Sequence, residues 1–441
     1  MTQTRGRGRR AIAIAIGATL AASALSGCAQ VFGVAGEDNT LTWWVNPDGV
    51  ETQKALAEEC SKGKPYDIDV QQLPTDATQQ RVQLARRLAA DDSTIDLMNI
   101  DPPFMSELAN AGYLAEVPED LADAATGSDV LQGVAETVTW DDKIYGIPQW
   151  ANTQVLWYRK SLAQQAGLDM SKPVTWDQVI EAAADNGGTV GVQANKYEAY
   201  AIWINQLIEG AGGHIVSDVD KGVDLSIDID SQAGRDAAAV IEKLADSKAA
   251  QPDLTNSNEG TSLGLMYAGA GEFMTNWTFV YANYAGLVGE GEGMISKQDF
   301  DDLGWARYPQ TVQGTESKPP IGGIDIGVGA FSEHKDWAFE VAECLTSPDS
   351  QTALAVTDGL MPARASVYDN PDLKEAYPAD LLALFRESID TGAPRPKTPY
   401  WSTISGAIQN EWHPPTSVDP DTTPKESATY IRDVLDGKAL L

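Results

Sequence analysis

Residues that commonly carry catalysis are scarce in this chain of 441 residues, which contains three histidines and three cysteines. The histidines, His214, His334 and His413, are far apart in the sequence and lack the spacing of metal ligands. Neither Lys-Ser nor Lys-Thr follows the Gly322-Gly323 pair, so this pair does not form a phosphate-binding loop. We therefore expect no metal site and no cofactor.

Basic residues are also few. The chain has 31 lysines and arginines but 64 aspartates and glutamates, which gives a net charge of −33. The first 27 residues contain four arginines and no acidic residue, so the rest of the chain carries a net charge of −37. Such an acidic body is repelled by phosphate backbones and by anionic membrane surfaces. This argues against nucleic acid as a partner, and membrane attachment would have to come from a lipid.

Apolar runs long enough to span a membrane are absent, but an export signal is present at the N-terminus. Four arginines precede an apolar run from Ala11 to Leu25, and Leu-Ser-Gly stands directly before Cys28. This layout resembles a bacterial lipoprotein signal, in which Cys28 is diacylated and begins the mature chain. The alternative is an ordinary signal peptide with an incidental cysteine. We expect a signal peptide over 1–27, a tether over 28–40, and a chain that is anchored to the membrane by two acyl chains.

The two other cysteines, Cys60 and Cys344, can form a single disulfide if the chain is exported. A disulfide between them would join the first helix to a late helix and close a loop of most of the chain. The alternative is two buried free thiols.

The length exceeds what one hydrophobic core usually organises, so we expect two lobes. Strands over 41–45, 68–73 and 95–100 alternate with helices over 50–60 and 81–90, which predicts a largely parallel sheet with helices on both faces. We further expect helices over 160–166, 176–185, 197–209, 231–247 and 335–345, strands over 272–280 and 326–331, and a loop over 304–320.

The stretch 145–160 is the most informative part of the chain. Its residues 153–158 are mostly β-forming, and Pro148 favours an extended conformation in the residue before it. A strand entered through a proline could cross between two lobes, with Trp150 and Asn152 offering an apolar face and an amide to a polar ring. The alternative is a buried strand whose aromatic side chains belong to a core.

Polar and aromatic side chains recur at predicted strand ends and loops in both halves of the chain. Asp101 follows a strand, where it can accept hydrogen bonds from ligand hydroxyls or cap the helix that follows. Asn46 lies in the loop after the first strand, and Gly323 precedes a late one. Trp277 lies in a predicted strand and Arg395 in a proline-rigid loop. Aromatic faces together with carboxylate, amide and guanidinium groups suit a sugar.

Three segments, in this order, resemble the extracellular solute-binding proteins of carbohydrate ABC importers: Tyr145-Gly-Ile-Pro148, Gly359-Leu-Met-Pro-Ala-Arg364 and Arg395-Pro-Lys-Thr-Pro-Tyr400. The resemblance covers essentially the whole chain after the signal. It implies an α/β, periplasmic-binding-protein-like fold of type II, in which each of two lobes is a mixed sheet flanked by helices and a hinge joins them. Lobe I would comprise 41–150 plus 310–356, and lobe II 151–309 plus 357–441.

Shorter motifs resemble more narrowly the trehalose-binding lipoproteins of mycobacterial trehalose-recycling importers. They are Gln83-Leu-Ala-Arg-Arg-Leu88, Asn152-Thr-Gln-Val-Leu-Trp-Tyr158, Val192-Gln-Ala-Asn195, Asn276-Trp-Thr-Phe279 and Ile321-Gly-Gly-Ile324. Position by position, this resemblance implies ligand contacts at Asp101, Asn152, Glu259, Trp277 and Arg395. Asn46 and Gly323 are further candidates from their loops, although residues 44–49 match the pattern less well.

The resemblance implies a binding protein, not an enzyme, on the outer face of the cytoplasmic membrane. It would capture trehalose, an α-linked glucose disaccharide, between its lobes and deliver it to an ABC permease with its ATPase. One alternative is a binding protein for another α-glucoside or oligosaccharide. Others are a secreted glycoside hydrolase, which would need two facing carboxylates, and a purely structural surface lipoprotein.

Overall fold

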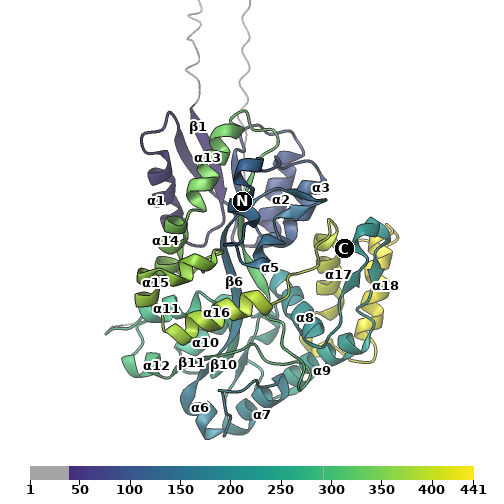
Figure 1. Cartoon of the computed structure of the whole chain (residues 1–441). Helices are drawn as coiled ribbons and strands as arrows, with labels where there is room; N and C mark the ends of the chain where they lie inside the picture. Colours follow the sequence, from purple (N-terminus) through teal and green to yellow (C-terminus); the bar gives the residue numbers. More distant parts are fainter. Residues whose placement is uncertain (1–38, 292) are drawn as a thin grey trace, which may run out of the picture. The chain divides into compact units, whose positions relative to one another are not determined.

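The longest strand, β6 (Ile147–Arg159), connects two halves of the sheet. The computed structural model describes residues 39–291 and 293–441 (Figure 1). Residues 147–153 of β6 pair with β12 (Ile321–Val328), whereas residues 154–159 pair with β10 (Phe273–Trp277) and β11 (Leu303–Ala306). One continuous strand therefore belongs to both sets of neighbours.

The first half of the sheet has the strand order β2-β1-β3-β12-β6. Its remaining strands are β1 (Thr40–Val45), β2 (Asp67–Gln72) and β3 (Leu97–Ile100). The predicted parallel arrangement is confirmed for these three, since β1 runs parallel to both β2 and β3. β12 runs antiparallel to β3 and to β6, which makes the sheet mixed.

The second half places β10 antiparallel to β6 and parallel to β7 (Val190–Gly191), while β11 also runs antiparallel to β6. Two small hairpins lie outside the main sheet: β4 (Thr139–Trp140) with β5 (Lys143–Ile144), and β8 (Val216–Ser217) with β9 (Ser226–Ile227). The prediction of a loop over 304–320 is wrong at its start, because residues 304–306 belong to strand β11. Trp305 pairs opposite Trp157 of β6, so β-pairing prevails there over the nearby glycine and prolines.

Pro148 lies inside β6 and not before it, at an irregularity in the pairing with β12. The register shifts between Ile324 and Asp325, and Pro148 stands opposite Asp325. A proline has no N–H to donate to the ladder, so a bulge is the arrangement that admits it into a strand. Beyond the bulge, the N–H of Ala151 donates to the carbonyl of Met361 at 2.8 Å. The segment that contains Met361 is thereby attached to β6 within the part that pairs with β12, close to where the pairing with β10 begins.

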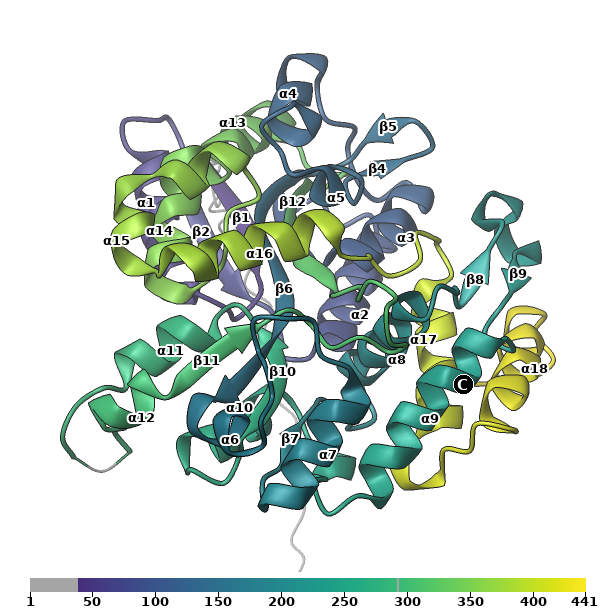
Figure 2. The ribbon, with the colours of Figure 1, turned by 60° about the horizontal axis from the view of Figure 1, so that its bottom comes forward.

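Helices cover both halves of the sheet, as Figure 2 shows. Their bounds are α1 (Val50–Ser61), α2 (Ala77–Leu88), α3 (Met105–Asn110), α4 (Ala122–Thr126), α5 (Gln132–Ala135), α6 (Lys160–Gln165), α7 (Trp176–Asn186), α8 (Glu198–Gly210), α9 (Gln232–Asp246), α10 (Glu259–Tyr267), α11 (Val280–Gly286), α12 (Lys297–Asp301), α13 (Lys335–Leu345), α14 (Pro348–Asp358), α15 (Pro371–Ala376), α16 (Ala379–Thr391), α17 (Trp401–Trp412) and α18 (Thr423–Leu435). The predicted helices over 160–166, 176–185, 197–209, 231–247 and 335–345 are confirmed within one residue at each end.

Within the described part of the chain, buried apolar side chains form two large clusters and one small one. The largest contains Trp43 of β1 and Trp401 of α17, and the second contains Trp157 of β6 and Phe385 of α16. The small cluster joins Trp150 to Ile324, Leu354 and Leu360. Trp150 is therefore packed among these side chains and does not offer a free aromatic face.

The predicted disulfide is present and joins Cys60 of α1 to Cys344 of α13, with 5.9 Å between their Cα atoms. The two cysteines are 284 residues apart in the sequence. The bridge therefore connects the first helix to a late one, and the alternative of two free thiols is wrong.

Removing this disulfide is expected to destabilise the protein without abolishing ligand binding. In the Cys60→Ser/Cys344→Ser double variant, the free energy of unfolding should fall by about 2–5 kcal/mol, because a long loop is no longer closed in the unfolded chain. Urea denaturation of the wild-type protein with and without a reducing agent should show the same decrease in the free energy of unfolding. Equal midpoints for oxidised and reduced protein would contradict this prediction.

The predicted signal peptide, the tether up to residue 38 and the lipidation of Cys28 lie outside the described residues. Across residues 39–291 and 293–441, no helix is both long and apolar enough to cross a membrane.

Candidate ligand-binding cavity

A cavity of about 1110 Å³ is lined by residues from both halves of the sheet. All seven predicted ligand residues line it: Asn46 after β1, Asp101 after β3, Asn152 in β6, Glu259 in the first turn of α10, Trp277 at the end of β10, Gly323 in β12 and Arg395 before α17. The fold thus brings together residues that lie far apart in the sequence. The volume is that of a small-molecule site.

Arg395 and Asp101 form a bidentate ion pair at the wall of this cavity. Nη2 of Arg395 donates to Oδ1 of Asp101 at 2.9 Å, and Nη1 donates to Oδ2 at 3.3 Å. The Arg395 side chain is only 3% exposed and that of Asp101 17%. Asp101 makes no capping hydrogen bond to the 3₁₀ turn Pro102–Phe104 that follows it. The capping role considered for Asp101 is therefore wrong.

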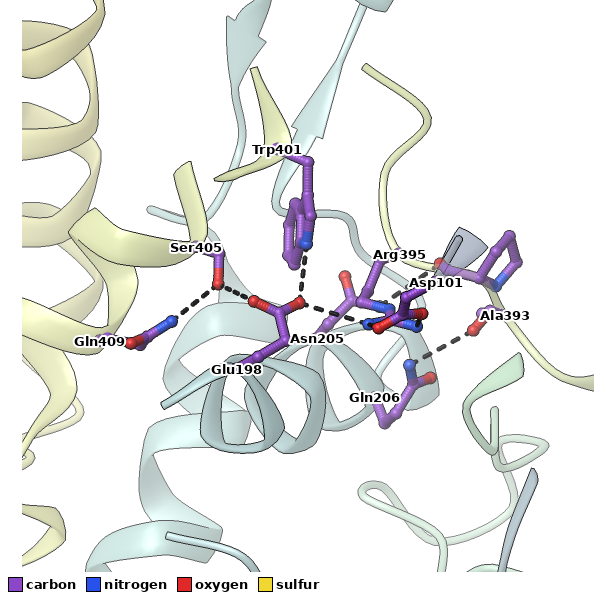
Figure 3. A network of polar contacts seen from close by, with 10 residues as sticks. Asp101, Glu198, Asn205, Gln206, Ala393, Arg395, Trp401, Ser405 and Gln409 are labelled. Atoms are coloured by element: carbon purple, nitrogen blue, oxygen red, sulfur yellow. Dashed lines mark hydrogen bonds and ion pairs between the residues drawn. The ribbon is translucent and has the colours of Figure 1, made fainter. Parts of the chain in front are cut away.

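A second carboxylate, that of Glu198 at the start of α8, contacts the same guanidinium (Figure 3). Nη1 of Arg395 lies 3.4 Å from Oε1 of Glu198, which also accepts a hydrogen bond from Nε1 of Trp401 at 2.8 Å. The hydroxyl of Ser405 donates to the other carboxylate oxygen. Burial raises the pKa of Glu198, while Arg395 and the two donors from α17 act in the opposite direction.

Two adjacent glycines in β12 allow close packing at the cavity: Gly322 leaves room for Asn152 and Trp277, and Gly323 for the backbone of Trp150. A Cβ atom on Gly322 would lie 2.4 Å from Oδ1 of Asn152 and 3.0 Å from the indole of Trp277. A Cβ atom on Gly323, where φ is +135°, would lie 2.2 Å from the carbonyl oxygen of Trp150. Oδ1 of Asn152 is buried and has no hydrogen-bond partner within the described part of the chain. Because Asn152 also lines the cavity, its amide is a candidate ligand contact whose oxygen is not paired within the protein.

Glu259 lies in the first turn of α10, which begins with a capping box formed by Asn258 and Thr261. Oε2 of Glu259 accepts a hydrogen bond from the hydroxyl of Tyr197 at 2.7 Å. Burial and the nearby Glu259 carboxylate raise the pKa of Tyr197, so this phenol stays protonated and remains a donor. The second oxygen of Glu259 can accept from a ligand hydroxyl.

Asn46 lines the cavity, but its amide is engaged inside the protein. Its Oδ1 accepts from Nδ2 of Asn99 at 2.8 Å, and its Nδ2 donates to Oδ2 of Asp48 at 2.7 Å. Asn46 therefore orients Asp48, which also lines the cavity. Desolvation raises the pKa of Asp48, and the hydrogen bond from Asn46 lowers it.

The polar residues of the cavity lining that sequence reasoning did not name as ligand residues include Asp48, Tyr197, Glu198 and Asp358. Asp358 is the last residue of α14, its Oδ2 is buried without a hydrogen-bond partner in the described ranges, and burial raises its pKa. Asp48 could have been found, since it belongs to the turn directly after the first strand. Glu198 gives no such signal, because it opens a helix whose aromatic pattern indicates core.

The described residues offer neither a metal-holding cluster nor a serine placed as a nucleophile. None of their histidine, cysteine, aspartate and glutamate side chains form a group of three or more that could hold a metal ion. Residues 260–264 match the Gly-x-Ser-x-Gly pattern of serine hydrolases, but they lie within α10 and not at a strand-to-helix turn. Ser262 is buried and its hydroxyl donates to the carbonyl of Val192 at 2.9 Å. It is not an exposed nucleophile.

Two curated proteins are similar to most of the chain. A probable ABC transporter-binding protein of Deinococcus radiodurans is 24% identical over 411 residues, which cover 88% of this chain and 90% of that protein. The diacetylchitobiose binding protein of Streptomyces coelicolor is 24% identical over 427 residues, covering 92% and 87% respectively.

Solved structures confirm the fold. Maltose-bound MalE3 of T. maritima superposes with a TM-score of 0.76 at 24% identity, covering 91% of this chain and 100% of that one. The GacH receptor of Streptomyces glaucescens, whose structures include an acarbose complex, gives a TM-score of 0.74 at 24% identity, covering 90% and 98%. The mixed α/β periplasmic-binding-protein fold expected from the sequence is therefore confirmed.

The family model for bacterial extracellular solute-binding proteins matches residues 46–352. That family binds solutes and does not transform them, so the expectation of a non-enzyme is confirmed and a glycoside hydrolase is excluded. With the cavity, the fold and the family match in agreement, this chain belongs to the bacterial extracellular solute-binding proteins.

Proposed function

We propose that this protein is the substrate-binding component of an ABC sugar importer and that it captures trehalose. The observation that carries the proposal is the set of groups in one cavity: the Arg395–Asp101 pair, the unpaired amide oxygen of Asn152, the Glu259 carboxylate and the Trp277 indole. Planar donors and acceptors beside an aromatic face suit a neutral disaccharide. Curated relatives named as transporter-binding and diacetylchitobiose-binding proteins support the sugar-importer part of the proposal.

Each residue has a role in this proposal. The Trp277 indole packs against the C–H face of one glucose ring. Arg395 donates to ligand hydroxyls, whereas Asp101 and Glu259 accept from them and Asn152 does both. Asn46 and the Gly322-Gly323 backbone shape the wall around the second ring.

We further propose that the two halves of the sheet act as lobes, residues 41–150 plus 310–356 and residues 151–309 plus 357–441, with β6 among the hinge segments. A sugar held by one lobe would recruit the other and shift the population toward the closed form. The closed form would dock on the permease and its ATPase. Diacylated Cys28 would hold the protein at the outer face of the cytoplasmic membrane.

A thermal-shift panel of neutral disaccharides tests the proposed ligand. A ligand that binds only the folded protein stabilises it by RT ln(1 + [L]/Kd), so the best ligand gives the largest increase in Tm at equal concentration. We expect trehalose to rank first, ahead of maltose and diacetylchitobiose. A larger shift with maltose would favour the second candidate, another α-glucoside, which the maltose-bound structure of similar fold suggests. No shift with any sugar would contradict the proposal.

Gly322→Ala is expected to weaken trehalose binding about tenfold, because overpacking by one methyl group costs about 1–3 kcal/mol. The added methyl would displace the Asn152 amide and the Trp277 indole. Gly264→Ala is a matched control, since a Cβ atom there meets nothing within 4 Å. Calorimetric titration of both variants makes the comparison, and equal affinities for the two would contradict this role of Gly322.

A further inference from the structure

Glu198 is a buried carboxylate that contacts both helix α17 and the cation of the cavity, Arg395. The side chain is 6% exposed and its carboxylate accepts from Trp401 and Ser405, both on α17, while it also contacts the guanidinium of Arg395. Figure 3 shows Glu198 between the two α17 donors on one side and Arg395 and Asp101 on the other. Helix α17 thus holds the Glu198 carboxylate in place beside the Arg395 guanidinium.

We propose that Glu198 is a positioning residue for saccharide recognition, which sets the orientation of the Arg395 guanidinium and thereby the Arg395–Asp101 pair at the cavity wall. This inference rests on the proposed function, because it concerns the same sugar site. Glu198 need not touch the sugar itself, since it acts through Arg395.

The geometry of the guanidinium supports this role. Nη1 of Arg395 is shared between Asp101 at 3.3 Å and Glu198 at 3.4 Å, while Nη2 donates to Asp101 alone at 2.9 Å. A planar group held by carboxylates at two edges cannot rotate about its long axis. Without the charge of Glu198, only the contacts with Asp101 would restrain the plane of the guanidinium, and its donors would no longer be preorganised for ligand hydroxyls.

Burial makes the ionised form of this carboxylate costly, so its replacement by an amide is a mild change for the fold. Burial raises the pKa of Glu198, which means that the ionised form is less favourable in the folded protein than in water. At neutral pH the unfolded chain carries an ionised glutamate, so ionising Glu198 in the folded state opposes folding. A neutral amide of the same shape would avoid this cost.

Glu198→Gln separates positioning from a structural role. We expect the Kd for trehalose to increase about tenfold or more, as for the loss of a hydrogen bond to a charged group, while Tm is unchanged or higher. Glu209→Gln is the matched control, because Glu209 also lies on α8, is shielded and contacts His214, but does not line the cavity. Its affinity should equal that of the wild-type protein.

The measurement is calorimetric titration with trehalose beside thermal unfolding of the ligand-free protein. An unchanged Kd in Glu198→Gln would overturn the inference, as would a parallel loss of Tm and affinity. If Glu198→Gln does not fold, Ser405→Ala is the second variant. It removes one hydrogen-bond donor to Glu198 but keeps the charge, so it must weaken trehalose binding. Unchanged affinity in Ser405→Ala would overturn the inference. The wild-type titration reports separately on the proposed function: if wild type prefers another sugar, that sugar is the probe for the same variants.

Discussion

Arg395→Ala should abolish detectable sugar binding and lower the free energy of unfolding by about 3–5 kcal/mol. The binding loss follows from removal of the guanidinium that faces the cavity. The stability loss follows because Asp101 and Glu198 would remain shielded from water without their cation. Titration calorimetry and urea denaturation of one preparation measure both effects.

Arg307→Ala is the control for this prediction. Arg307 pairs with Glu387 and Glu316 outside the cavity, and both partners are largely exposed. Exposed ion pairs contribute about 0–1 kcal/mol, so this variant should keep both affinity and stability. Retention of wild-type affinity by Arg395→Ala would remove Arg395 from the site, whatever happened to its stability.

Trp277→Ala should weaken sugar binding by about 10- to 150-fold, the equivalent of about 1.5–3 kcal/mol for losing a large apolar contact surface. The indole is partly exposed at the end of β10 and lines the cavity, so little core packing is lost with it. Tm in the absence of sugar should therefore change little. Calorimetric titration and thermal unfolding measure the two quantities.

Trp305→Ala tests whether the effect is specific to the cavity. Trp305 is also partly exposed at a strand, but it packs against Tyr281 and lies outside the cavity lining. Its replacement should leave the affinity unchanged. Equal affinity losses in the Trp277 and Trp305 variants would indicate a general loss of structure and would contradict a stacking role for Trp277.

Much of the fold could be predicted from the sequence because its signals are local. The alternation of strands and helices in the first hundred residues gave the parallel arrangement of β1, β2 and β3. α14 was missed although Ser347 and Gly359 mark its ends, because three of the five side chains that it buries, Ser350, Gln351 and Thr352, are polar and its apolar periodicity is therefore weak. β11 was missed because its pairing with β6 is a tertiary effect that overrides the loop-forming residues nearby.

The candidate site was only partly predictable for a similar reason. Asp101 and Trp277 lie at strand ends and Arg395 lies in a proline-rigid loop. Charged or aromatic side chains at such positions indicate ligand contacts, so these three could be predicted. The partners of these residues come from elsewhere in the chain. Glu198 is 197 residues from Arg395, and nothing in the pattern of α8 marks its first residue as part of a charge network. Such long-range pairing is set by packing of α17 against α8, which the sequence does not display.

Calorimetric titration of the purified protein with trehalose, followed by analysis of the recovered sugar, tests the central claim most directly. The account predicts saturable binding of one trehalose per protein, tighter than the binding of maltose, with the disaccharide recovered intact. Absence of binding, or tighter binding of maltose under the same conditions, would contradict the claim that this cavity captures trehalose.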